Sequence, residues 1–283
     1  MISLLFTFII LGLVVWILLF PDPIKKVLNY AYPSVPYEVN ENAKVTDEYT
    51  LYSNKDSPAD KLVVVFIGGS GIFSNVSTVY GFTNHLNTAL GVEYDILTFP
   101  YPVRFKYTVH DTLVHITNLL RNFLHYNEYH AIGISYGAML FGGFYQKESN
   151  ADIAREMQVD RIGINFRSFT GISGIYSSQF NISLLTKMFH FYILRKTPGN
   201  KYYSCYGIRD ISVFVISSLS DFLLSQTINF LNSEHPESYI YRTKKLPHNF
   251  PQLLNLPEAT DCIDRVVKHI KGNSEVKQPS VNA

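Results

Sequence analysis

The sequence predicts an α/β protein built on a mostly parallel sheet with helices on both faces. Short apolar runs alternate along the chain with longer segments of helical spacing, an order typical of parallel sheets. The run Leu62–Ile67 is apolar at every position, as expected of a central strand that is buried on both faces. The segment Gly133–Gly137 reads Gly-Ile-Ser-Tyr-Gly between two apolar segments, which indicates a sharp turn from a strand into a helix.

The predicted elements of the first half are a hairpin, two strands and two helices. Val109, Leu113, Ile116, Leu120 and Phe123 repeat at helical spacing, which predicts an amphipathic helix there. In chain order we expect the hairpin Tyr37–Asn54, the strand Leu62–Ile67, a helix over about Ser77–Leu90, the strand Tyr94–Phe99 and the helix Thr108–Leu124.

The second half continues the alternation. We expect strands at Tyr129–Ile134, Val159–Ile164, Ser212–Ser217 and Tyr239–Tyr241, a helix from Ala138 to about Gln146, and a last helix at Pro257–Ile270. Proline near the start of a helix and glycine just past its end are favoured, and Pro257 and Gly272 fit these positions. The polar segment Gly272–Ala283 is predicted to be a disordered tail.

The N-terminal segment Ile2–Phe20 is almost entirely apolar. As a helix it would span about 28 Å, close to the thickness of the hydrocarbon layer of a bilayer. A cleaved signal peptide and a buried core helix are the alternatives. A signal peptide would need a basic start and a small-residue cleavage site, and the segment has neither. We therefore expect a retained anchor, followed by the proline-containing linker Pro21–Pro36. Lys25 and Lys26 favour a cytosolic location for the rest of the chain.

Composition excludes some classes of function. The net charge of the 283 residues is +1, and no basic run favours a nucleic-acid partner. Two cysteines, Cys205 and Cys262, are too few for a disulfide framework, so buried free thiols are favoured over a single pair. No metal-ligand spacing is present, so we expect neither a metal nor another cofactor.

Ser135 is the candidate nucleophile, because the central serine of this pattern stands on a strained turn with its hydroxyl exposed at the sheet edge. A serine needs a base that is oriented by an acid, and in proteins with this motif the acid and then the base follow it. Asp221 comes just after the strand Ser212–Ser217. The alternative is that Asp221 caps a helix beginning at Phe222, and one residue could partly do both.

His248 is the candidate base, since it follows the last predicted strand in a loop. An ordinary loop histidine is the alternative. The other histidines considered lie in or beside helices or at the wrong ends of strands: His110, His115, His125, His130, His235 and His269.

Backbone N–H groups must stabilise the oxyanion of such a reaction. Tyr136, the residue after the nucleophile, is expected to supply one, and the glycine-rich loop Gly68–Gly71 the others. A tight turn or a phosphate-binding loop is the alternative for this loop. It lacks the Gly-Lys-Ser/Thr and G-x-G-x-x-G patterns of nucleotide sites.

These motifs together resemble the α/β-hydrolase superfamily over about Lys61–Lys271. The stretch Leu62–Tyr101 is similar to the His-Gly-Gly-Gly region of esterases related to hormone-sensitive lipase. The resemblance implies that Gly69 and Ser70 supply oxyanion N–H groups along with Tyr136. Ile67 and Ser70 depart from that pattern, which has a histidine and a third glycine there. By residue number the expected organisation is an anchor at 1–20, a linker at 21–36, a hydrolase domain at 37–271 and a tail at 272–283.

A cap or lid insertion is expected over about residues 175–208, where this superfamily commonly inserts one. Within it, Asn181–Lys196 combines large apolar side chains with three basic residues. It is either an amphipathic lid that contacts acyl chains or membrane, or an ordinary covering helix. The candidate substrate or lid residues are Leu185, Met188, Phe189 and Tyr192.

The function predicted from the sequence is that of a membrane-anchored serine hydrolase. It would cleave a lipophilic carboxylic ester, a small molecule or a lipid, through Ser135, Asp221 and His248 and an acyl-enzyme. An acyltransferase or peptidase with the same three residues, or a non-catalytic binding protein of this fold, are the alternatives.

Overall fold

The computed structural model describes residues 37–54, 59–69, 71, 74–103, 107–178, 194, 197–248 and 250–274. The predicted anchor Ile2–Phe20 and the linker Pro21–Pro36 lie outside these residues, and so does most of the predicted lid. Among the helices in the described ranges, none is both long enough and apolar enough to cross a membrane. The anchor therefore stays a prediction from the sequence.

One mixed sheet forms the centre of the described chain, with the strand order β1-β2-β4-β3-β5-β6-β7-β8. The strands are β1 (Ala43–Val45), β2 (Thr50–Tyr52), β3 (Lys61–Phe66), β4 (Tyr94–Thr98), β5 (Glu128–Ile134), β6 (Phe166–Ile172), β7 (Ser212–Ser218) and β8 (Glu237–Tyr241). The β1–β2 hairpin and the β2–β4 pair are antiparallel, and every other neighbouring pair is parallel. This confirms the mostly parallel sheet and the N-terminal hairpin.

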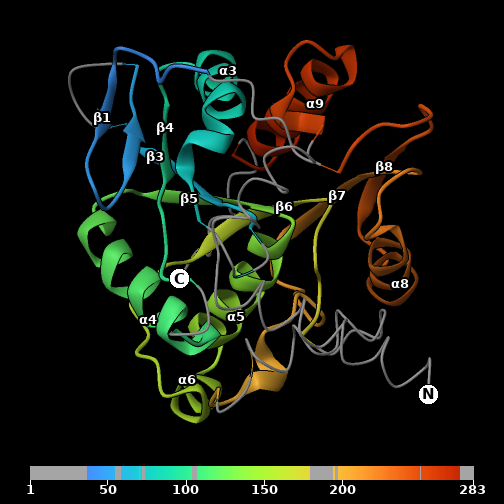
Figure 1. The fold of residues 1–283 in the computed structure, drawn as a ribbon. Helices are drawn as coiled ribbons and strands as arrows, with labels where there is room; N and C mark the ends of the chain where they lie inside the picture. The colour runs from blue at the N-terminus through green and yellow to red at the C-terminus, as the bar shows by residue number, and fades with distance from the viewer. Residues whose placement is uncertain are drawn as a thin grey trace, which may run out of the picture. The chain divides into compact units, whose positions relative to one another are not determined.

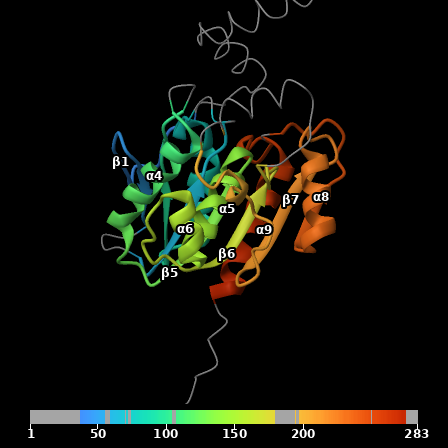
Figure 2. The same cartoon turned by 90° about the horizontal axis from the view of Figure 1, so that it is seen from below.

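Helices cover both faces of the sheet, as Figures 1 and 2 show. On one face lie α3 (Tyr80–Leu90) and α9 (Pro257–Ser274), and on the other lie α4 (Val109–Leu120), α5 (Tyr136–Ser149) and α8 (Leu224–Glu234). The short helix α6 (Ala151–Met157) packs against α5. Right-handed crossovers explain the arrangement, because connections that move along the sheet in opposite directions place their helices on opposite faces.

Aromatic side chains pack between β3, β5, β6 and α5. The rings of Phe141 in α5 and Phe169 in β6 are stacked with centroids 4.2 Å apart. Phe66 at the end of β3 contacts Phe141 edge to face at 5.6 Å. All three side chains are fully buried, so α5 is held firmly on the sheet. Cys205 and Cys262 are also buried, and both are free, as the sequence favours.

The predicted strand Val159–Ile164 is wrong. Residues 159–165 form a loop, and the strand β6 begins only at Phe166. Side chains of α5 bind the backbone of this loop. The carboxylate of Glu148 accepts hydrogen bonds from the N–H groups of Ile162 and Gly163. Because these backbone groups are satisfied by a side chain, the apolar run does not need a neighbouring strand.

The last helix extends beyond the predicted end at Ile270. It continues through Gly272 to Ser274, so the predicted tail is wrong for its first three residues, and residues 275–283 lie outside the described range. The hydroxyl of Ser274 accepts a hydrogen bond from Tyr94 at 2.8 Å and contacts the carboxylate of Glu128. These contacts with β4 and β5 hold the final turn against the sheet.

Candidate active site

Ser135 lies at the sharp turn between β5 and α5, at the carboxyl edge of the sheet. Its backbone has φ 54° and ψ −118°, a strained combination for a residue with a side chain. The turn brings α5 very close to β3, because a Cβ atom on Gly137 would lie 1.9 Å from the carbonyl oxygen of Phe66. Only glycine fits at that position, which explains the pattern seen in the sequence.

Hydrogen bonds to β6 and the segment after it hold this turn. The N–H of Ser135 donates to the carbonyl oxygen of Ile172 at 2.9 Å, and the N–H of Ile175 donates to the carbonyl oxygen of Ser135 at 3.0 Å. The strained conformation is therefore fixed on both sides by backbone contacts. Because these contacts use only backbone atoms of Ser135, its hydroxyl can interact with other side chains of the site.

Asp221 follows the carboxyl end of β7 and is buried. Its Oδ1 atom accepts a hydrogen bond from the N–H of Leu223 at 2.8 Å. The N-cap of α8 is Leu223, so Asp221 orients the turn before the helix and is not its capping residue. Its carboxylate is directed to a second partner, His248.

His248 connects Asp221 with Ser135. The Nδ1 atom of His248 lies 2.9 Å from Oδ1 of Asp221, and its Nε2 atom lies 2.9 Å from Oγ of Ser135. The three side chains thus form a continuous hydrogen-bonded chain at one edge of the sheet. The structure therefore brings the three candidate residues Ser135, Asp221 and His248 together.

The loop that carries His248 is attached to the loop that carries Asp221. The N–H of Lys245 donates to Oγ of Ser220 at 2.9 Å. Within the His248 loop, the N–H of Phe250 donates to the carbonyl oxygen of Pro247 at 3.0 Å. These hydrogen bonds therefore hold the imidazole of His248 beside the carboxylate of Asp221.

The charge on Asp221 determines which imidazole nitrogen carries the proton. Burial raises the pKa of Asp221, but the hydrogen bond and charge of His248 and the N–H of Leu223 outweigh it, so the pKa lies below its ordinary value. An ionised carboxylate can only accept, so Nδ1 of His248 must donate to it. The Nε2 atom is then the acceptor that faces the hydroxyl of Ser135.

The candidate oxyanion donors lie around Ser135. Tyr136 is the first residue of α5, where helix N–H groups lack partners within the helix. Gly68 approaches the nucleophile closely, since a Cβ atom on it would lie 3.1 Å from Cβ of Ser135. The next residue, Gly69, has φ 127°, a region that favours glycine. Ser70, the other residue that the resemblance implies, lies outside the described residues.

Two groups of candidate residues are not part of this arrangement. The lid residues Leu185, Met188, Phe189 and Tyr192 lie outside the described ranges. His130 in β5 hydrogen-bonds Ser168 and Glu128, and burial lowers its pKa to about 4 although Glu128 favours the charged form. The Nε2 atom of His130 also lies 3.1 Å from Oγ of Ser274, and none of these three partners belongs to the chain of Ser135, His248 and Asp221.

No sequence motif identifies one neighbour of the base. The ring of Phe222 lies 4.4 Å from the imidazole of His248, centroid to centroid, and its side chain is 61% exposed. The signal along the chain that could have identified it is its place directly after the candidate acid. The contact covers one side of the imidazole with an apolar surface.

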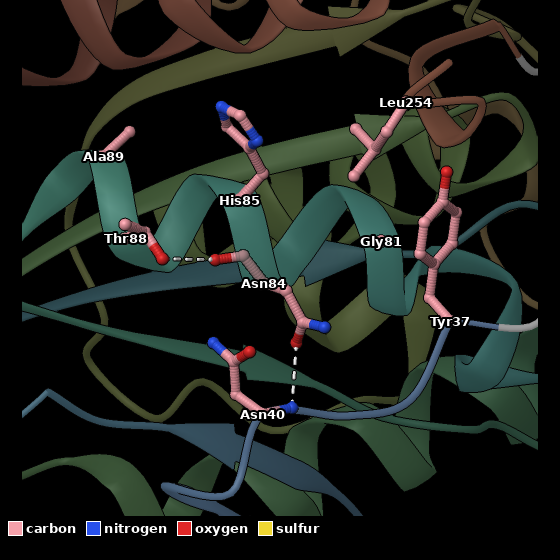
Figure 3. A pocket seen from close by; sticks show the side chains of 8 residues that line it. All are labelled: Tyr37, Asn40, Gly81, Asn84, His85, Thr88, Ala89 and Leu254. Atoms are coloured by element: carbon pink, nitrogen blue, oxygen red, sulfur yellow. Dashed lines mark hydrogen bonds between the residues drawn. The ribbon is translucent and has the colours of Figure 1, made fainter.

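A separate groove lies on the outer side of α3, where Tyr37, His85 and Leu254 are among its lining residues (Figure 3). Its volume is about 300 Å³. None of the residues that line it belongs to the chain of Ser135, His248 and Asp221. Within the described ranges, no cluster of three or more His, Cys, Asp or Glu residues could hold a metal ion.

Comparisons with known proteins agree with this fold. No protein-family model matches the chain, and no curated protein matches its sequence. Among solved structures, an inhibited esterase B from Lactobacillus rhamnosis superposes with a TM-score of 0.74 at 14% identity, covering 90% of this chain and 94% of that one. Crystals of EstE5 soaked with p-nitrophenyl butyrate give a TM-score of 0.65 at 14% identity, with 88% and 90% covered.

A hormone-sensitive lipase from a metagenome library superposes with a TM-score of 0.63 at 15% identity, covering 84% of this chain and 86% of that one. The similarity in each case extends over most of both chains, while the sequences have diverged almost completely. TM-scores of this size show a shared fold, and at such low identity the likeness extends to the fold alone. The chain therefore has the α/β-hydrolase fold.

Proposed function

We propose that this protein is a serine hydrolase that cleaves carboxylic esters. The observation that carries the proposal is the pair of 2.9 Å contacts that join Ser135 Oγ, His248 and Asp221 at the strained turn after β5. Polar side chains meet at many sites, but a strained serine beside an oriented imidazole is what nucleophilic catalysis requires. The esterases and lipases with the same fold make ester hydrolysis the best-supported reaction.

The geometry supports a two-step reaction. The Oγ atom of Ser135 attacks the ester carbonyl carbon while Nε2 of His248 takes its proton, and Asp221 stabilises the imidazolium that forms. The N–H groups of Tyr136, Gly69 and Ser70 are the proposed donors to the oxyanion. His248 then gives its proton to the departing alkoxide, which leaves an acyl-enzyme. In the second step His248 activates a water molecule, which releases the acid and restores Ser135.

We infer that the substrate is lipophilic. Phe222 is an exposed apolar side chain beside His248, and the segment 181–196 is rich in large apolar residues. Leu185, Met188, Phe189 and Tyr192 are proposed to contact the acyl chain.

We propose that Ile2–Phe20 anchors the enzyme in a membrane, with the hydrolase domain on the cytosolic side. The apolar length and the lysines that follow support this topology. Carbonate extraction should leave the full-length protein in the membrane fraction, and deletion of Met1–Phe20 should release it. Release of the full-length protein by carbonate would exclude the anchor without affecting the proposed reaction.

Hydrolysis of p-nitrophenyl butyrate by the purified protein tests the reaction. Replacement of Ser135 with alanine should lower turnover by roughly 10⁵–10⁶. Ser233→Ala, an exposed serine hydroxyl of α8, serves as the control and should hydrolyse the ester at the wild-type rate. Equal rates for wild type and Ser135→Ala would rule out Ser135 as the nucleophile.

A further inference from the structure

We propose that Tyr101 is the positioning residue of the oxyanion hole, an inference that rests on the proposed function and deepens it. Tyr101 follows β4 and is 4% exposed. Its hydroxyl oxygen lies 2.9 Å from the carbonyl oxygen of Ile67 and 2.9 Å from that of Gly68. One side chain from a different loop therefore binds two successive peptide groups next to the nucleophile.

The hydroxyl of Tyr101 is a permanent donor at this position. Burial raises the pKa of Tyr101 well above its ordinary range, so the phenol keeps its proton. A phenol has a single proton, which is shared between the two carbonyl oxygens. The Tyr101–Ile67 contact is fully buried, so water cannot readily replace the hydroxyl if it is removed.

Binding of these carbonyl groups fixes the direction of the N–H groups that follow them. In a planar trans peptide the C=O of one residue and the N–H of the next point in opposite directions. Holding the carbonyl of Ile67 fixes the N–H of Gly68, and holding the carbonyl of Gly68 fixes the N–H of Gly69. Both N–H groups consequently point away from the hydroxyl of Tyr101.

Such a restraint is needed because the loop has little stiffness of its own. Gly68 and Gly69 lack side chains, and Gly69 already has φ 127°, so either peptide could rotate at small steric cost. A rotated peptide would present a carbonyl oxygen where a donor is required. An oxyanion hole stabilises the transition state only if its donors are oriented before the charge develops.

Tyr101 also contacts the other components of the hole. Its own N–H donates to Oγ of Ser74 at 2.9 Å, farther along the same loop. Its ring lies 6.4 Å from the ring of Tyr136, whose N–H is also a proposed donor. Tyr101 thus contacts the glycine loop at Ile67 and Gly68 and again at Ser74. It also contacts Tyr136, the first residue of α5.

The variant Tyr101→Phe removes only the hydroxyl. Removal of a single oxyanion donor lowers kcat by about 10²–10³ in enzymes of this kind, so misorientation should lower it by about 10–100-fold. KM should stay within about twofold. The inhibition constant of a trifluoromethyl ketone, to which Ser135 adds to form an oxyanion, should rise by the same factor as kcat falls. Ser74→Ala should shift both quantities in the same direction by a smaller factor.

Tyr129→Phe is the matched control, because Tyr129 also donates from a buried hydroxyl to a backbone carbonyl, that of Phe123, at 2.9 Å. It should lower the melting temperature about as much as Tyr101→Phe and leave kcat unchanged. If Tyr101→Phe and Ser74→Ala both keep kcat and the inhibition constant within twofold of wild type, Tyr101 has only a structural role. A wild-type protein without Ser135-dependent hydrolysis would instead overturn the proposed function, and this inference with it.

Discussion

The Nε2 atom of His248 lies 2.9 Å from the Oγ atom of Ser135, although 113 residues separate the two in the chain. The parallel register of the sheet produces this contact. β5, β6, β7 and β8 are successive parallel neighbours, so the loops that follow them meet at one edge. Ser135, Asp221 and His248 follow β5, β7 and β8, respectively, and are brought together there.

Replacement of Asp221 with asparagine should inactivate the enzyme while keeping its shape. The amide group can donate to Nδ1 of His248, which would favour the tautomer with the proton on Nε2, where it cannot accept the proton of Ser135. We expect kcat to fall on the order of 10⁴. Ester hydrolysis at neutral pH measures this, and an asparagine variant with more than a tenth of wild-type kcat would contradict the assigned tautomer.

The same variant should change the pH dependence of stability. The pKa of Asp221 is lower in the folded state than in the unfolded chain, so its contribution is present above the unfolded pKa of about 4 and is lost as pH falls through the folded pKa. The difference in unfolding free energy between wild type and Asp221→Asn should be about 1.5–3 kcal/mol at pH 7. Urea titrations between pH 2 and 7 should show this difference in unfolding free energy becoming smaller at acid pH. A difference that grows as pH falls would mean that the sign of the pKa shift is wrong.

Replacement of Gly137 with alanine should disrupt the turn at the nucleophile. The new Cβ atom would lie 1.9 Å from the carbonyl oxygen of Phe66, so α5 or β3 must move. We expect a loss of about 3 kcal/mol of unfolding free energy, the upper end of the usual cost of overpacking, because the new contact is with backbone. Gly272→Ala in α9 is the control: nothing lies within 4 Å of its Cβ position, and helix propensity predicts a gain of about 0.5–1 kcal/mol. Equal melting temperatures for the two variants would contradict this account of the turn.

The proposed lid should determine the preference for acyl chain length. Each methylene group buried against an apolar side chain contributes about 0.8 kcal/mol, so kcat/KM for p-nitrophenyl esters should rise from acetate toward medium chains. Replacing Phe189 and Tyr192 with serine should flatten this rise and leave acetate hydrolysis nearly unchanged. A uniform loss across the series, together with a lower melting temperature, would indicate that the segment only covers the domain.

Much of this architecture follows from local sequence patterns. β3 and β5 are apolar runs bounded by polar or glycine residues, and α4 has both helical spacing and a capping box at Thr108. The order of the elements then implies a parallel sheet. Ser135, Asp221 and His248 could be chosen because each follows a predicted strand, and the parallel sheet brings those positions to the same edge.

The remaining features depend on contacts between distant residues. The apolar run before β6 resembles a strand, and only the carboxylate of Glu148, which binds its backbone, shows why it is a loop. Tyr101 is one of 20 tyrosines, and nothing in its neighbourhood along the chain shows that its hydroxyl reaches Ile67 and Gly68. The last turn of α9 likewise depends on contacts between Ser274 and the sheet.

Covalent labelling with a fluorophosphonate probe tests the central claim most directly, because it reports an activated serine whatever the substrate. The wild-type protein should form one adduct, which peptide mapping by mass spectrometry places on Ser135. The adduct should be absent from Ser135→Ala and form far more slowly in His248→Ala, which loses the base 2.9 Å from the hydroxyl. An unlabelled wild-type protein, or labelling that persists in Ser135→Ala, would contradict the account.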